Sequence, residues 1–232
     1  EMVIRDWSSD VCSSDLILFG EFDTSAGPKI AFQTPVGFFP SEAWDSVFEY
    51  IIAKPALCSH FISVCAHGYR IAGIPICLTG SKYFRNAYVF NVAIVLSECA
   101  SGVGTASRFE SALSSFSSAL SELETSRGFL HQVDGRLATE NLLPQLSEAL
   151  NSLGSVASGG EKVLNVPGTE MAIKIRVPAI IGVSNSFDGE EEEEDVDGIL
   201  LWRQPGIPVT AVSEIRSEER RVGKECRSRW PP

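Results

Sequence analysis

One arginine is set where it could do chemistry. The stretch GSKYFRNAYVFN (Gly80–Asn91) places Arg85 after an aromatic pair and just before an apolar run typical of a strand. A guanidinium group is permanently charged and offers five donors in a planar fork, which suits recognition of a phosphate group better than an ammonium does. An arginine in a polar turn is also commonly only solvated. The residues alone therefore leave two interpretations open: a solvated loop residue, or a cation presented from a rigid base.

No other group of residues has the spacing of a familiar catalytic or binding motif. The sequence contains no GxxxxGK[ST] phosphate loop, no GxSxG nucleophile elbow and no HExxH metal pair. Its histidines fall in a strand start, a turn and an interhelix segment, so they indicate no catalytic relay; they are His60, His67 and His131. The glycine-rich SGVGTASR lacks the lysine of a phosphate loop and is better explained as a connector. We expect the chain itself to bind no cofactor and no metal.

Both ends of the chain resemble translated sequencing-adapter DNA rather than protein. The two stretches are RDWSSDVCSSDL (Arg5–Leu16) and RSEERRVGKECRSRW (Arg216–Trp230). We therefore interpret 1–16 and 216–232 as adapter-derived, and expect the genuine chain to run from about 17 to 215 with its true ends missing. The basic tail would otherwise suggest a nucleic-acid-binding or nuclear-targeting segment.

Charge and cysteine usage restrict the class of protein. The formal net charge is −11, and the charges of the two adapter-like ends cancel, so 17–215 keeps that value. An acidic chain argues against nucleic acid or an anionic membrane as the main partner. No segment approaches the roughly 18 apolar residues that span a bilayer, so we expect a soluble, cytoplasmic protein. Four cysteines lie in apolar runs without CxxC spacing, which favours buried reduced thiols: Cys58, Cys65, Cys77 and Cys99.

The hydrophobic periodicity predicts the elements that would hold Arg85. Alternating and apolar runs predict five strands, and apolar stripes at helical spacing predict three helices. The last of the five strands is apolar on both faces, as expected of a central strand. The predicted strands cover about 17–22, 29–35, 60–66, 69–78 and 87–97, and the helices lie within 40–54, 109–123 and 143–153.

The order β-β-α-β-β-β-α-α predicts an α+β fold, in which a five-stranded, mostly antiparallel sheet has one helix on one face and two on the other. This domain would cover 17–158, followed by an extra β-hairpin over 159–178. The segment 179–215 contains the block DGEEEEED and is predicted to be a mostly disordered acidic linker, with a partner-binding role as the alternative. Several aromatic residues could pack either in the core or on a partner: Phe38, Phe39, Trp44, Phe48 and Tyr50.

Four stretches together give the chain a family resemblance. FGEFDTSAGPKIAFQTP, EYIIAKPAL, IAGIPICL and above all KYFRNAYVFN resemble the N-terminal longin-type domain of nitrogen permease regulator 2-like proteins. The similarity runs in order from Ile17 to about Val177 and is faint beyond it. The serine-rich helix and the EEEEED block depart from the animal members, and we interpret them as variation in a fungal lineage. The resemblance implies that the predicted fold is a longin-like α/β/α sandwich.

The resemblance also implies a function. Proteins of this family are subunits of the GATOR-one complex, called SEACIT in fungi, which activates GTP hydrolysis by Rag (Gtr) GTPases and so restrains TOR signalling during amino-acid or nitrogen starvation. Their partners are a nitrogen permease regulator 3-like subunit, bound longin to longin, a DEP-domain subunit, and the GTPase at the vacuolar or lysosomal surface. In the KYxRNA motif Arg85 would be the arginine finger, while Lys82, Tyr83 and Asn86 would shape the loop or contact the GTPase. The chain would activate a GTPase only within its complex, without being an enzyme by itself.

The alternative is a longin scaffold without a catalytic part, which mediates heterodimerisation in a trafficking or signalling complex. The position of Arg85 distinguishes the two. A finger requires Arg85 to be exposed on a short loop and free of an intramolecular carboxylate, whereas an Arg85 buried in an ion pair favours the scaffold.

Overall fold

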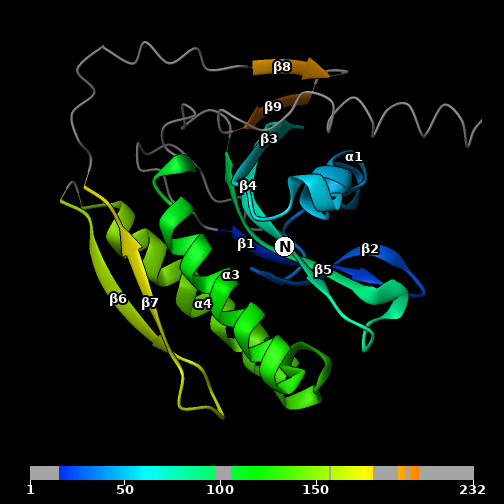
Figure 1. Cartoon of the computed structure of the whole chain (residues 1–232). Helices are drawn as coiled ribbons and strands as arrows, with labels where there is room; N and C mark the ends of the chain where they lie inside the picture. The colour runs from blue at the N-terminus through cyan, green and yellow to red at the C-terminus, as the bar shows by residue number, and fades with distance from the viewer. Residues whose placement is uncertain (1–15, 98–105, 157, 180–192, 197–198, 204–232) are drawn as a thin grey trace, which may run out of the picture.

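The core of the molecule is an antiparallel β-sheet. A computed structural model describes residues 16–97, 106–156, 158–179, 193–196 and 199–203 (Figure 1). The main sheet has seven strands in the order β2-β1-β5-β4-β3-β9-β8. These strands are β1 (Leu16–Asp23), β2 (Gly27–Thr34), β3 (Ile62–Ala66), β4 (Tyr69–Thr79), β5 (Ala87–Ser97), β8 (Glu193–Val196) and β9 (Ile199–Arg203).

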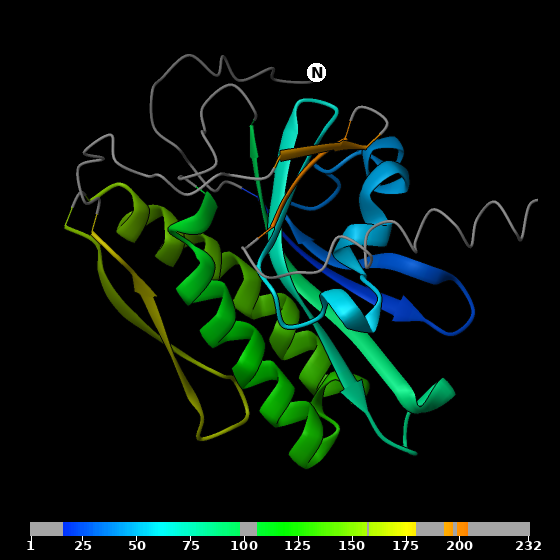
Figure 2. The same cartoon turned by 45° about the horizontal axis from the view of Figure 1, so that its top comes forward.

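Helices cover both faces of this sheet. Helix α1 (Ser41–Ile51) lies on one face, and α3 (Glu110–Arg127) and α4 (Val133–Gly154) lie together on the other (Figures 1 and 2). Short 3-10 turns connect the elements: η1 (Pro55–Leu57), η2 (Phe84–Asn86) and η4 (Phe129–His131). The predicted α+β sandwich, with strands β1 to β5 between one helix and two, is confirmed.

Strand β5 is central, as its apolar sequence predicts. Because side chains alternate across a strand, Phe90, Val92 and Ile94 face the core shared with α3 and α4. Ala93 and Val95 face the opposite core, which α1 covers. A strand buried on both faces is a rigid support for the loop that precedes it.

A separate hairpin covers the outer side of α3 and α4 (Figure 1). It consists of β6 (Gly160–Asn165) and β7 (Ala172–Val177), within the predicted range 159–178. Its inward residues Leu164, Ile173 and Ile175 are buried and belong to the same core as the two helices. Both helices are therefore enclosed between the sheet and the hairpin.

Two described segments lie outside the predicted longin-like domain and hairpin. Leu16, the last residue of the adapter-like head, is the first residue of β1, where it is buried and pairs with Val95. In the predicted acidic linker, β9 pairs with β3 and β8 pairs with β9, so two short strands lie within the range predicted to be mostly disordered. The apolar run ILLW of β9 meets the edge of β3, whose unpaired backbone groups favour an added strand. The rest of that linker and of both ends lies outside the described residues.

The aromatic residues around α1 belong mainly to the core. Phe39, Trp44 and Tyr50 are all less than 9 % exposed, and Phe48 packs partly buried against the same cluster. Phe38 is 41 % exposed. The interpretation that they pack within the domain is therefore the better one for most of them.

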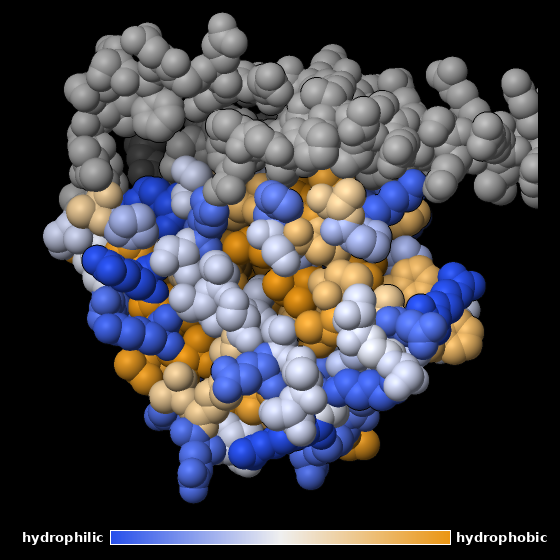
Figure 3. All heavy atoms as spheres, viewed as in Figure 1, coloured by the Kyte–Doolittle hydropathy of each residue, from blue (hydrophilic) through white to orange (hydrophobic). Residues whose placement is uncertain are grey.

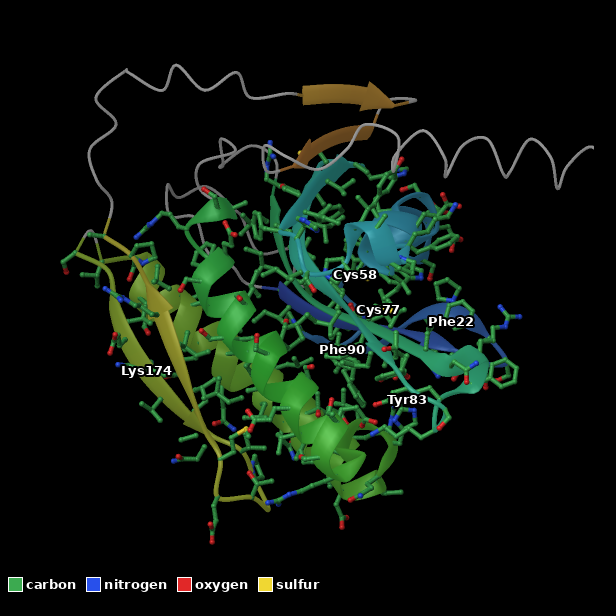
Figure 4. All side chains as sticks on the ribbon, viewed as in Figure 1. Phe22, Cys58, Cys77, Tyr83, Phe90 and Lys174 are labelled. Atoms are coloured by element: carbon green, nitrogen blue, oxygen red, sulfur yellow. The ribbon has the colours of Figure 1, made fainter. Side chains whose placement is uncertain are left out.

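The described cysteines are free thiols. Cys65 is buried as predicted, whereas Cys58 and Cys77 are only half-buried and lie close to each other (Figure 4). Burial raises the pKa of the Cys58 thiol to about 12, and the Cys77 thiol adds to this effect, so Cys58 is a poor nucleophile. Cys99 lies outside the described residues. Among the described helices, none is both long and apolar enough to cross a membrane.

Candidate functional site

The loop that carries Arg85 joins β4 to β5 and is closed by its own backbone. The amide of Tyr83 donates to the carbonyl of Gly80 at 3.1 Å, and the amide of Asn86 donates to the carbonyl of Tyr83 at 3.0 Å. The amide of Gly80 in turn donates to the carbonyl of Asn86 at 3.0 Å. These three bonds join the loop to itself at the end of two paired strands, so the loop is compact.

The backbone at Arg85 itself is unusual. Arg85 and Asn86 both have φ of 58°. This value lies in the left-handed region of backbone conformation, which residues with a Cβ atom rarely adopt. Asparagine tolerates this conformation because its short side chain can hydrogen-bond locally, whereas arginine has no such compensation. Residues held in such conformations cluster at functional sites, where the surrounding structure fixes them.

The Arg85 side chain is exposed and is flanked by two aromatic rings. Its guanidinium carbon lies 6.0 Å from the ring centre of Phe22 and 5.7 Å from that of Phe84, distances compatible with cation–π attraction. Among the residues that the structure describes, no carboxylate forms an ion pair with Arg85. Its donors are therefore available to an external anion.

The surface around Arg85 is both apolar and charged. Phe84 is 60 % exposed directly beside the arginine. On the face shown in Figure 3, apolar residues lie next to strongly polar ones at the right-hand end, where the β1–β2 and β4–β5 turns are found. An exposed aromatic next to an arginine is typical of protein–protein contact sites.

Lys82 and Tyr83, which precede Phe84 and Arg85, point inward, toward the helices. Lys82 donates from Nζ to the carbonyls of Glu124 at 2.8 Å and Thr125 at 3.4 Å. The hydroxyl of buried Tyr83 donates to Oε1 of Glu124 at 3.0 Å, and Figure 4 shows Tyr83 on the helix side of the loop and Phe22 on the opposite side. Burial raises the pKa of Tyr83. Of the predicted site residues, Lys82 and Tyr83 contact α3, and Arg85 and Asn86 are exposed.

Both Lys82 and Tyr83 donate hydrogen bonds to Glu124 of α3. Its side chain is 1 % exposed, and its Oε2 accepts the amide of Leu130 at 2.8 Å. Nδ1 of His131 lies 3.1 Å from Oε1, and Nζ of Lys82 lies 3.5 Å from the same oxygen. Glu124 was not predicted as a site residue, although the sequence contains a signal: Glu124 follows Leu120 by four positions on the apolar stripe of α3, where a carboxylate needs partners.

A second buried carboxylate, Glu21 of β1, directly precedes Phe22. It accepts Nη1 and Nη2 of Arg136 at 3.0 and 2.9 Å and the hydroxyl of Tyr88 at 2.8 Å. Burial by itself would raise the pKa of Glu21, but the bonds from Arg136 and Tyr88 outweigh it, so the pKa lies below its ordinary value. Strands β1 and β5 and helix α4 are thereby joined next to Phe22.

The other candidate places do not show the chemistry of a catalytic centre. Within the described residues, no three His, Cys, Asp or Glu side chains are grouped so that they could hold a metal ion. A shallow groove between β4 and α3 is lined mainly by hydroxyl and apolar side chains, with Glu122 as its charged residue. That lining offers no cation for a phosphate group. The β4–β5 loop is therefore the best candidate site of the described chain.

The comparisons with known proteins agree with the resemblance carried by this loop. Residues 15–181 match the sequence profile of the family described as nitrogen permease regulator 2. The chain is 33 % identical over 90 residues to the nitrogen permease regulator 2 homolog of Schizosaccharomyces pombe, a match that covers 35 % of this chain and 22 % of that protein. It is 29 % identical over 136 residues to the GATOR complex protein NPRL2 of Drosophila melanogaster, covering 58 % of this chain and 32 % of that protein. The chain thus spans at most about a third of the length of these two relatives.

Proposed function

The chain belongs to the nitrogen permease regulator 2 family, and we propose that it carries the arginine finger of a complex that activates Rag-type (Gtr) GTPases. In this proposal Arg85 enters the nucleotide site of the GTPase. Its guanidinium neutralises the charge that develops on the γ-phosphoryl oxygens, while the nucleotide, the magnesium ion and the attacking water belong to the GTPase.

One observation carries this proposal: Arg85 is exposed and, within the described residues, is not paired with a carboxylate. A scaffold role alone would be favoured by an arginine buried in an ion pair. The left-handed backbone at Arg85 also supports a functional role, because such a conformation costs on the order of 1–3 kcal/mol at a residue without local compensation.

Family membership extends the proposal to partners. The Drosophila relative is named as a GATOR complex protein, and we place this chain in the equivalent assembly. Its partners there would be a nitrogen permease regulator 3-like subunit, bound through paired longin domains, and a DEP-domain subunit. The complex would act at the vacuolar or lysosomal surface when amino acids or nitrogen are scarce and restrain TOR signalling. The net charge of −11 argues against direct binding to an anionic membrane.

The test uses the full-length protein in its complete complex. Single-turnover GTP hydrolysis by the GTPase is measured with wild-type complex and with Arg85→Ala and Arg85→Lys. Both variants are expected to lose stimulation by on the order of 10³-fold or more, because lysine lacks the planar fork of donors. Arg176→Ala is the matched control, since Arg176 is an exposed arginine on the β6–β7 hairpin, paired with Glu161. Normal stimulation by a fully assembled Arg85→Ala complex would refute the finger.

A further inference from the structure

We propose that Glu124 is a positioning residue for Arg85: it holds Lys82 and Tyr83, which precede Phe84 and the finger, and so fixes the direction in which the guanidinium projects from the loop. The inference rests on the proposed function of Arg85. It assigns a role to a helix residue that lies some forty positions away in the sequence and that does not itself contact the GTPase.

The contacts of Lys82 and Tyr83 converge on one residue. The Tyr83 hydroxyl bonds the Glu124 carboxylate at 3.0 Å, and the Lys82 ammonium bonds the Glu124 carbonyl at 2.8 Å and lies 3.5 Å from the carboxylate. The Lys82 ammonium also lies 4.8 Å from the ring centre of Tyr83. Adjacent residues of the loop are thus attached to the same turn of α3.

These contacts fix Arg85 through the backbone. The Tyr83 carbonyl accepts a hydrogen bond from the amide of Asn86, so the turn that contains Arg85 begins at Tyr83. The side chain of Tyr83 is in turn bonded to Glu124. A left-handed arginine persists only where its surroundings impose that conformation. When the Tyr83 side chain is released, more common backbone conformations become accessible at Arg85, and the guanidinium moves away from its position.

Glu124 is itself held firmly. Its side chain is 1 % exposed, and its second oxygen accepts the amide of Leu130 at 2.8 Å. Helix α3 ends immediately afterwards at Gly128, whose φ of 67° allows the chain to turn back toward the carboxylate. The Glu124 carboxylate therefore bonds both the arginine loop and the connection between α3 and α4, and transmits the rigidity of the helices to the loop.

The test separates positioning from structural damage by comparing two states of the GTPase. The complete complex is titrated with GTPase loaded with GDP and aluminium fluoride, which mimics the transition state, and with GTPase loaded with a non-hydrolysable GTP analogue. A finger contributes mainly to the transition state. Tyr83→Phe removes only the hydroxyl, and Glu124→Gln removes the charge; Glu122→Gln, an exposed neighbour on α3, is the matched control.

We expect Tyr83→Phe and Glu124→Gln to weaken binding of the transition-state mimic by roughly 10- to 100-fold, the cost of a displacement of about 1 Å at a reacting centre. Binding of the GTP-analogue form, its stoichiometry, and all values for Glu122→Gln should stay at the wild-type level. If Glu124→Gln fails to assemble, Tyr83→Phe decides the question, because it keeps the shape of the ring.

Two results would overturn the inference. In the first, Arg85→Ala weakens binding of the mimic whereas Tyr83→Phe and Glu124→Gln do not. That result would support Arg85 as the finger but refute its positioning by Glu124. In the second, both nucleotide states or the stoichiometry are affected alike, which makes Glu124 a structural residue. Unchanged binding of the mimic by Arg85→Ala would instead refute the proposed function itself.

Discussion

The guanidinium carbon of Arg85 lies 6.0 Å from the centre of the Phe22 ring, and this contact joins the tip of the β4–β5 loop to the end of β1. The ring is itself well placed, because the preceding residue, Glu21, is bonded to Arg136 and Tyr88. A cation–π contact at an exposed site stabilises by about 0.5–1 kcal/mol. Phe22 therefore restricts the directions that the Arg85 side chain adopts before it meets an anion.

The first prediction concerns this ring. Phe22→Leu keeps an apolar side chain but removes the π face, so stimulated GTP hydrolysis should fall by about 2- to 5-fold, which corresponds to the loss of about 0.5–1 kcal/mol. Single-turnover hydrolysis with the complete complex measures it. Phe48→Leu on α1 removes another partly buried ring that packs on the same core cluster as Phe22; it serves as the control and should behave as wild type. A loss as large as that of Arg85→Ala would show that Phe22 does more than restrict the side chain.

The second prediction concerns the left-handed backbone at Asn86, where φ is 58°. Asn86→Gly should retain nearly full stimulation, because glycine adopts this conformation without steric cost. Asn86→Val should lose roughly tenfold or more, since a β-branched residue is a genuine outlier there, at about 1–2 kcal/mol. The same hydrolysis assay compares the two. If glycine were as harmful as valine, the Asn86 side chain would itself contact the GTPase.

The pattern of apolar residues in the sequence was sufficient to predict the fold, because strands and helices that are buried carry apolar residues at regular spacing. The run AYVFNVAIVLS is apolar at odd and even positions alike, and β5 indeed buries both of its faces. Strands β8 and β9 were not predicted because β8 lies within the acidic run, which indicates solvation, and because the pairing of β9 with the edge of β3 depends on which backbone groups are left open in three dimensions.

The site was predictable only in its exposed part. KYFRN points to Arg85 as a rigidly presented cation, but local sequence does not show that Arg85 adopts a positive φ. The partners of the buried carboxylates are equally hidden, because Arg136 lies 115 positions from Glu21 and Glu124 lies 41 positions from Tyr83. Such pairs follow from how the helices pack on the sheet.

The third prediction is a pH dependence that originates at Glu21. Its pKa in the folded protein lies below the ordinary value of 4.5, so the stabilisation by the charged form is fully present above about pH 4.5 and is lost as the pH falls through the folded-state pKa. Glu21→Gln should therefore be clearly less stable than wild type at pH 7, and the difference should shrink near pH 3. Urea denaturation at the two pH values measures it.

The control for this prediction is Glu122→Gln. Glu122 is exposed on α3, and surface substitutions usually change stability by less than about 0.5 kcal/mol, so little change is expected at either pH. A difference between wild type and Glu21→Gln that stays constant from pH 7 to pH 3 would contradict the prediction, because it would mean that the charge of Glu21 contributes nothing.

The fourth prediction concerns Gly135, where α4 passes close to η4. A Cβ at this position would lie 1.9 Å from the carbonyl oxygen of Phe129 and 2.7 Å from its carbonyl carbon. Backbone atoms cannot move aside as a flexible side chain can, so Gly135→Ala should destabilise the protein by about 1–3 kcal/mol, measured by urea denaturation. Gly154→Ala is the control: its Cβ would meet only ring atoms of Phe109, at 3.1 Å, and should cost less.

Gly135→Ala should also change the position of the β4–β5 loop that carries Arg85. Leu130 and His131 follow Phe129 directly, and both contact the Glu124 carboxylate. A shift of this segment moves Glu124 away from Tyr83, so Gly135→Ala should reduce stimulated hydrolysis even at temperatures where the complex is fully assembled, whereas Gly154→Ala should not. Full activity of an assembled Gly135→Ala complex would show that the connection between α3 and α4 does not influence the position of Arg85.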